Sequence, residues 1–156
     1  MFHVVLYQPE IPPNAGNVMR LCTNTGARLH LIEPLGFAID DRRLRRAGLD
    51  YRARTVFDTW PDFDTFLARV APRRLHMFTR HGRTRYDRVA FAADDALVFG
   101  PETRGLPASL IRRGAEEGGV YLPMQPDNRS INLGNVVSIA LYEAWRQNAF
   151  EGSENK

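Results

Sequence analysis

The fold that this sequence favours is decided by the stretch YLPMQPDNRSINLGNVVSIALYEAW, residues 121–145. Residues 120–122 have the composition of a buried strand end, and Pro123 and Pro126 stop that strand because proline cannot donate to a β-ladder. Apolar side chains then recur at helical spacing from Leu133 to Ala144. A polar turn lies between the two elements, and its members are Asp127, Asn128, Arg129, Ser130 and Asn132. A strand end that leads into a capped helix is where open α/β sheets bind ligands.

The chain before this stretch alternates strands with helices. Strands are expected at residues 2–7, 28–32, 75–79 and 96–99, with a brief further strand near Val56. Helices are expected at residues 14–25, 61–70 and 107–113, with a short basic helix at 40–48. Asn14 is expected to cap the first helix and Gly26 to end it in the left-handed conformation, whereas the polar residues 80–87 predict a loop. This order predicts an α/β fold, a mostly parallel sheet with helices on both faces.

The length of 156 residues suits one domain spanning 1–156, with 152–156 as a frayed tail. The start lacks the pattern of a signal peptide, and no apolar run reaches the roughly 18 residues of a membrane span. The expected location is therefore the cytoplasm. Cys22 is the only cysteine, so a disulfide framework and a thiolate metal cluster are excluded, and this residue is expected to be buried.

Arginine dominates the basic residues. Lys156 is the only lysine among 21 Lys and Arg, and the net charge is only +3. The excess can reflect a genome rich in G and C, or it can serve phosphate and base recognition through the planar guanidinium. The local signal for a polyanion partner is a cluster made of Arg42, Arg43, Arg45, Arg46, Arg52 and Arg54.

Three loops follow a strand and precede a helix. In residues 9–20, Asn14, Asn17 and Arg20 lie near one helical face, although by themselves they are explained more simply by a capped helix with solvated polar residues. In residues 99–107, Gly100 and Gly105 permit close backbone approach or a positive φ. Glu102 between them must be solvent-facing, paired or catalytic. The third loop is the polar turn, where Ser130 and Asn132 can bind a ligand.

Several chemistries lack their signatures. Neither GxGxxG after the first strand nor a P-loop is present, and no Ser or Cys lies in a GxSxG turn. The four histidines are scattered, and His3, His30 and His76 lie in expected strands, so they predict packed or edge residues rather than metal ligands. The remaining signal is a set of Gly- and Pro-rich loops that suits a flat cofactor.

The three loops carry a resemblance to a known family. PEIPPNAGNVMRLC, FGPETRGLP and LPMQPDNRSINLGNVVSIALYEAWRQ resemble motifs 1, 2 and 3 of the SPOUT RNA methyltransferases, and LHLIEPLGF and DDRRLRRAGLDY extend the similarity. Within that family the chain is most similar to bacterial enzymes that methylate the ribose 2′-oxygen of the wobble nucleotide, C or U, in the tRNA anticodon loop. The resemblance implies a SPOUT fold with a C-terminal trefoil knot, which ordinary topology rules would not propose.

The resemblance also implies S-adenosyl-L-methionine as cofactor, no metal, the tRNA anticodon stem-loop as substrate, and a homodimer. The positions that match the family's cofactor site are Phe78, Thr79, Gly100, Glu102, Gly105, Leu122, Met124, Ser130 and Leu133. Arg20 matches the arginine to which a base role is assigned in related members. Because guanidinium stays protonated to beyond about pH 12, gripping the ribose or a phosphate is the rival role. Asn14 and Asn17 would position Arg20 and the ribose, with Ser130 and Asn132 as further catalytic candidates.

The sequence allows more than one interpretation of the last helix and of the function. The helix that begins near Leu133 has a second apolar strip, made of Val136, Ile139, Tyr142 and Trp145, which predicts a dimer seam or a fully buried core helix. The functional alternatives are methylation of another tRNA or rRNA nucleotide, a non-enzymatic RNA-binding protein that keeps the fold, and a flavodoxin-like nucleotide module. The missing phosphate-loop signature disfavours the last.

Overall fold

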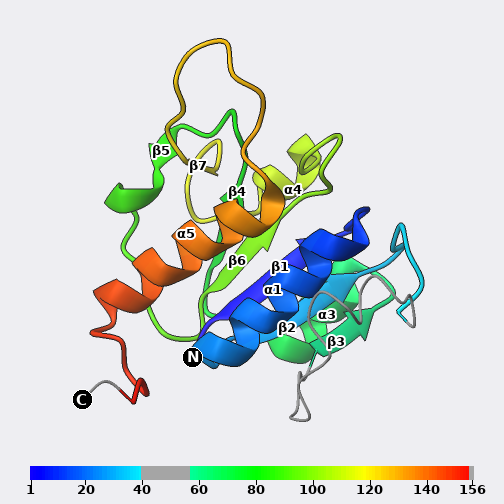
Figure 1. Ribbon diagram of the computed structural model, residues 1–156, viewed down its shortest axis with the longest axis horizontal. Helices are drawn as coiled ribbons and strands as arrows, with labels where there is room; N and C mark the ends of the chain where they lie inside the picture. The colour runs from blue at the N-terminus through cyan, green and yellow to red at the C-terminus, as the bar shows by residue number, and fades with distance from the viewer. Residues whose placement is uncertain (40–56, 155–156) are drawn as a thin grey trace.

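The computed structural model describes residues 1–39 and 57–154, and its centre is a seven-stranded sheet in the order β3-β2-β1-β6-β4-β7-β5 (Figure 1). The strands are β1 (His3–Tyr7), β2 (Arg28–Ile32), β3 (Phe57–Trp60), β4 (Leu75–Phe78), β5 (Thr84–Arg85), β6 (Ala96–Phe99) and β7 (Val120–Tyr121). Every neighbouring pair in this sheet runs parallel. The predicted parallel α/β architecture is therefore confirmed.

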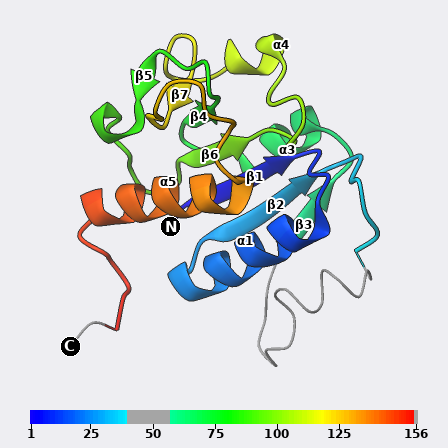
Figure 2. The ribbon, with the colours of Figure 1, turned by 45° about the horizontal axis from the view of Figure 1, so that its top comes forward.

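Helices cover both faces of the sheet (Figure 2). They are α1 (Pro12–Thr25), α3 (Phe63–Val70), α4 (Ala108–Ile111), α5 (Leu133–Gln147) and the 3-10 turn η2 (Tyr86–Arg88). Successive side chains of a strand point to opposite faces, so Val4 and Leu6 pack under α1 and α5 while Val5 packs with α3 and α4. The sheet thus separates two hydrophobic clusters, as a doubly wound fold requires.

Apart from shifts of one or two residues at the ends of β1, β4 and α3, the observed elements differ from the predicted ones in three places. Helix α1 begins at Pro12, two residues before Asn14, because the first helical positions need no N–H and tolerate proline. Asn14 is therefore not the N-cap, which was a wrong prediction, whereas Gly26 ends α1 at φ 72° as predicted. Helix α4 is shorter than residues 107–113. The predicted loop 80–87 contains β5, because pairing with β7 orders Thr84 and Arg85.

Other predictions fall outside the described residues. These are the helix at 40–48 and the arginine cluster Arg42, Arg43, Arg45, Arg46, Arg52 and Arg54. Val56 itself is also outside, but the brief strand predicted near it is confirmed by β3, which begins at the next residue. The trefoil knot also stays a prediction, because strand pairings define neighbours and not how the chain is threaded. Among the described helices, none combines the length and the hydropathy that crossing a membrane requires.

Buried polar residues behave as predicted. His3, His30 and His76 are all buried, and His30 lies between His3 and the indole of Trp60, which donates to its Nδ1 at 3.1 Å. Burial lowers the pKa of His30 to about 3, so this imidazole is neutral. Burial also raises the pKa of the Cys22 thiol to about 12, which makes it an unreactive core residue.

Helix α5 is apolar on two sides. Its inward face is buried in the core, with Leu133, Val137, Ala140, Leu141 and Ala144 as its members. On the other side, Ile139 is 40% exposed and Tyr142 is 47% exposed. The prediction of a fully buried core helix is thus wrong for a single chain. An apolar strip of α5 stays open to solvent, with α1 beside it (Figures 1 and 2).

Candidate functional site

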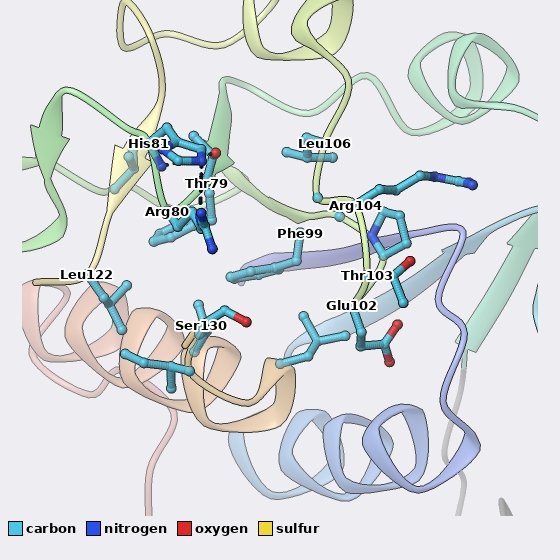
Figure 3. Close-up of a pocket in the computed structure, with 18 of the residues that line it drawn as sticks. Thr79, Arg80, His81, Phe99, Glu102, Thr103, Arg104, Leu106, Leu122 and Ser130 are labelled. Atoms are coloured by element: carbon cyan, nitrogen blue, oxygen red, sulfur yellow. Dashed lines mark hydrogen bonds between the residues drawn. The ribbon is translucent and has the colours of Figure 1, made fainter. Parts of the chain in front are cut away.

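A cavity of about 660 Å³ lies at the carboxyl ends of β4, β6 and β7, against the first turn of α5 (Figure 3). Parallel strands end at the same edge of a sheet, so loops that are distant in sequence meet there. All nine residues predicted to bind the cofactor line this cavity, namely Phe78, Thr79, Gly100, Glu102, Gly105, Leu122, Met124, Ser130 and Leu133. The structure brings the predicted set together, and their individual roles stay predictions.

The turn between β6 and α4 depends on two glycines. A Cβ on Gly100 would overlap the backbone of Gly105 and Leu106, so only glycine fits at that position. Gly105 has a φ of 68°, and its N–H donates to the carbonyl of Pro101 at 2.9 Å. Close approach at Gly100 and positive φ at Gly105 are both realised. The turn thereby exposes main-chain atoms along one wall of the cavity.

The carboxylate of Glu102 is paired. It accepts hydrogen bonds from the backbone N–H of Glu10 at 2.9 Å, from that of Ile11 at 3.2 Å and from Nδ2 of Asn14 at 3.1 Å. The two backbone donors lie directly before Pro12, the first residue of α1, where the positive end of the helix dipole favours a negative charge. Of the three predicted options for Glu102, the structure shows pairing. Its charge stabilises the start of α1.

The side chain of Asn14 continues this network into the third loop. Asn132 donates from Nδ2 to Oδ1 of Asn14 at 2.9 Å, and its own Oδ1 accepts the N–H of Gly134 at 2.9 Å. Asn132 is the N-cap of α5. A continuous chain of hydrogen bonds therefore links Glu102, Asn14 and Asn132, one residue from each of the three loops.

A second brace joins the first two loops. The N–H of Thr103 donates to Glu10 at 3.1 Å, and its hydroxyl donates to the same carboxylate at 2.9 Å. Arg104 donates to the side-chain oxygen of Gln8. Glu10 in the first loop thus accepts hydrogen bonds from the second loop, and Glu102 in the second loop accepts hydrogen bonds from the first. These contacts fix the two loops against each other.

Gly118 and Val120 form another wall of the cavity. A Cβ on Gly119 would lie 2.8 Å from the carbonyl oxygen of Met77, which is too close for any other residue. The N–H of Thr79 donates a hydrogen bond of 2.8 Å to the carbonyl of Val120, and the N–H of Thr84 donates one of 3.1 Å to the carbonyl of Gly119. These bonds tie the wall to β4 and β5.

A buried ionic group anchors the base of that wall. His76 is fully buried, with Nδ1 3.0 Å from Glu116 and Nε2 2.9 Å from Asp95. Arg74 makes a bidentate contact with the same Asp95, at 2.7 and 3.2 Å. Burial alone lowers the pKa of His76, but its hydrogen bonds to Glu116 and Asp95 raise that pKa above the ordinary 6.5. Protonated His76 can donate to both carboxylates.

The predicted catalytic residues separate into two groups. Asn14, Ser130 and Asn132 line the cavity. Asn17 and Arg20 are exposed on α1 and do not line it, although Asn17 lies beside Gly134 at the start of α5. Within one chain the structure therefore does not bring Arg20 to the wall of this cavity.

Sequence reasoning missed Arg80 and His81 as cavity residues. They follow Phe78 and Thr79 directly at the end of β4, and this position was the available signal. Arg80 donates from Nε to Nε2 of His81 at 2.9 Å, and Figure 3 shows the pair across the cavity from Glu102. Among the residues that the structure describes, no group of three or more His, Cys, Asp or Glu could hold a metal ion.

The chain is similar to one family of known proteins, both in sequence and in structure. The model of the SpoU rRNA Methylase family matches residues 1–142. Relatives named tRNA (cytidine(34)-2′-O)-methyltransferase match nearly the whole chain. The protein from Aeromonas hydrophila is 55% identical over 153 residues, which are 98% of each chain. The protein from Escherichia coli K12 is 52% identical over 153 residues, again 98% of each chain.

Solved structures agree with these relatives. A structure described as giving insight into the 2-OH methylation of C or U 34 on tRNA is 42% identical, has a TM-score of 0.87, and covers 96% of this chain and 97% of its own. A SpoU methyltransferase from Streptomyces viridochromogenes, solved in complex with AdoMet, is 23% identical with a TM-score of 0.80. That match covers 94% of this chain and 57% of the other, and it supports the fold alone.

Proposed function

Because this chain belongs to the SpoU rRNA methylase family, we propose that it transfers the methyl group of S-adenosylmethionine to the ribose 2′-oxygen of the wobble nucleotide, cytidine or uridine 34, in tRNA. The relatives that it matches over nearly their whole length carry that activity in their names. The observation that carries the proposal is the convergence of three loops on one cavity, tied together through Glu102, Asn14 and Asn132.

The residues present fit this cofactor. A volume of about 660 Å³ lies in the range of small-molecule sites. Leu122, Leu133 and Phe99 offer apolar walls for a flat base, and the turn from Gly100 to Gly105 offers main-chain donors and acceptors. When bound, the cofactor supplies a methyl group activated on a sulfonium. The protein then has to align the 2′-oxygen and let its proton leave.

We assign positioning roles to Asn14 and Asn132. Their carboxamides are used in holding α1 against the start of α5, so neither side chain is fully available to a substrate. Ser130 differs, because its hydroxyl lines the cavity and has no hydrogen-bond partner among residues 1–39 and 57–154. Ser130 is therefore the residue of this loop that is proposed to contact the ribose.

Arg20 and Asn17 are proposed to act on the cavity of a second copy. They are exposed on α1, away from the cavity of their own chain, and the open strip of α5 with Ile139 and Tyr142 lies on the helix packed beside α1. A homodimer through these two helices would cover the strip. A protonated Arg20 suits a grip on the ribose or on a phosphate better than proton abstraction.

The tRNA contacts are proposed to come from arginines. Arg83 pairs with Glu117 and Arg85 pairs with Asp87, so within the described residues 80–88 Arg80 and Arg88 are the better candidates for phosphate contacts. The arginine cluster at 42–54, which lies outside the described residues, stays a candidate on the sequence alone. The reaction is proposed to need no metal and to take place in the cytoplasm, where tRNA is available.

The test is mass spectrometry of ribonucleosides from tRNA incubated with the protein and S-adenosylmethionine. We expect 2′-O-methylcytidine or 2′-O-methyluridine at the wobble position, with no loss when EDTA is present. Methylation at another nucleotide would correct the substrate assignment. Calorimetric titration with S-adenosylhomocysteine separates the remaining alternative, since an RNA-binding protein that only keeps the fold would release no binding heat.

A further inference from the structure

The arginines that follow β4 differ in how their charge is balanced. Arg83 lies 2.8 Å from the carboxylate of Glu117, and Arg85 lies 2.6 Å from that of Asp87. Neither residue lines the cavity. Arg80 does line it, and among the described residues no carboxylate lies within ion-pair distance of its guanidinium. Of the arginines at positions 80, 83 and 85, the one that lines the cavity is therefore the one without a carboxylate partner among the described residues.

The other charged groups of the cavity are already engaged. Glu102 accepts three hydrogen bonds from the start of α1 and its neighbour Asn14. Arg104 donates to Gln8. Within residues 1–39 and 57–154 the Arg80 side chain donates only from Nε, to the ring of His81, so its two Nη groups keep their donors for a ligand. His81, which lines the cavity beside Arg80, offers a further ring nitrogen.

We propose that Arg80, with His81 beside it, forms an anion-binding subsite of the cavity that takes the oxygens of a carboxylate or a phosphate. This inference rests on the proposed function and deepens it. A guanidinium holds such oxygens through paired N–H donors. It also repels a positively charged sulfonium, which favours an anionic group of the ligand at Arg80 over the sulfonium.

Two groups of the reaction partners carry such oxygens. One is the carboxylate at the amino-acid end of S-adenosylmethionine, and the other is an RNA phosphate next to the target ribose. Both would neutralise Arg80 only when a ligand occupies the cavity. A test therefore has to distinguish three contributions to binding: that of the nucleoside part of the cofactor, that of its amino-acid end, and that of RNA.

The experiment compares Arg80→Gln with the control Arg83→Gln in the full chain. S-adenosylhomocysteine and 5′-methylthioadenosine, which lacks the carboxylate, are titrated by calorimetry. If the subsite takes the carboxylate, Arg80→Gln weakens binding of S-adenosylhomocysteine by about tenfold or more and leaves 5′-methylthioadenosine within about twofold. Arg83→Gln is expected to match the wild type for both ligands.

If the subsite takes a phosphate, Arg80→Gln leaves S-adenosylhomocysteine unchanged. It then raises the KM for tRNA and reduces the salt slope of tRNA binding by about one. The proposal is overturned if Arg80→Gln matches Arg83→Gln in every titration, or if it weakens both nucleosides equally, which a structural role would do. A wild-type protein that fails to bind S-adenosylhomocysteine contradicts the proposed function, while the tRNA titration still tests Arg80.

Discussion

Asn132 donates a hydrogen bond of 2.9 Å to the carboxamide oxygen of Asn14, across 118 positions of sequence. Through this bond the N-cap of α5 is joined to α1, and through Asn14 it is joined to Glu102. Each of the three loops that form the cavity therefore depends on the other two. Removing one member should loosen the cavity without emptying the hydrophobic core.

The bond between the two asparagines should be measurable by a double-mutant cycle. Asn14→Ala and Asn132→Ala each leave a partner unsatisfied, and each should lower the free energy of unfolding by about 1–2 kcal/mol. The double variant should lose less than the sum, with a coupling energy of at least about 0.5 kcal/mol. Urea unfolding checks this. Asn128→Ala is the control, since the Asn128 side chain makes only a long bond of 3.4 Å to Gln125 in the part of the chain that the structure describes. Additive losses at positions 14 and 132 would refute the link.

Replacement of Glu102 by glutamine tests whether its charge stabilises the start of α1. The amide keeps the shape, but it removes the negative charge and presents an NH₂ group to donors that need an acceptor. We expect a loss of about 1–2 kcal/mol in the free energy of unfolding and weaker binding of S-adenosylhomocysteine. Glu117→Gln is the matched control because Glu117 is highly exposed. Equal stability of the two variants would contradict the role.

Part of this site was predictable from the sequence. The position of the cavity followed from strand ends and from Gly100 and Gly105, whose steric needs are local. The pairing of Glu102 was not predictable, because its partners Glu10 and Ile11 lie about ninety positions away and donate from the backbone. Strand β5 was missed for the same reason, since only its pairing with β7 makes residues 84 and 85 a strand.

More of the fold than of the site could be predicted from the sequence. Continuous apolar runs identified β1, β4 and β6, which lie in the middle of the sheet, because strands covered on both faces need no polar side chains. Asn14 was assigned to the helix cap because asparagine favours that position. In the structure Ile11 is the N-cap and Pro12 and Pro13 are the first helical residues, so the Asn14 side chain bonds to Glu102 and Asn132 instead.

The group around His76 predicts a dependence of stability on pH. Burial lowers the pKa of His76, but Glu116 and Asp95 raise it above 6.5 overall, so the folded state binds the proton more tightly than the unfolded state. This contribution is complete below the ordinary pKa and is lost as the pH rises through the raised one. Urea unfolding from roughly pH 6 to 9 should show the loss.

Glu116→Gln should flatten that pH profile because it removes one of the two carboxylates that raise the pKa of His76. Arg74 faces the same group through Asp95 and stays protonated throughout this range. Glu117→Gln, at the neighbouring exposed position, should keep the wild-type profile. A profile for Glu116→Gln that coincides with the wild type would exclude His76 as the titrating group.

The dimer proposal predicts that a charge on the open strip of α5 separates the protomers. Ile139→Asp should give a monomer at micromolar concentration by light scattering, because a buried unpaired carboxylate is costly at an apolar interface. Ile39→Asp is a matched control, since Ile39 and Ile139 are each 40% exposed in the single chain. A monomeric wild type, or a dimer that survives Ile139→Asp, would show that the strip is not the interface.

A dimer also allows Arg20 to be tested by complementation. If Arg20 acts on the cavity of the second copy, Arg20→Ala and a variant with a filled cavity, such as Leu122→Trp, should each be inactive alone. Mixed dimers would contain one intact site, formed by the cavity of the Arg20→Ala protomer and Arg20 of its partner. In a random mixture about half of the dimers are heterodimers, and each heterodimer has one intact site out of two. Methylation should therefore return to about a quarter of the wild-type rate. Activity that stays absent after subunit exchange would place Arg20 on the cavity of its own chain, and an active Arg20→Ala protein would remove Arg20 from the reaction.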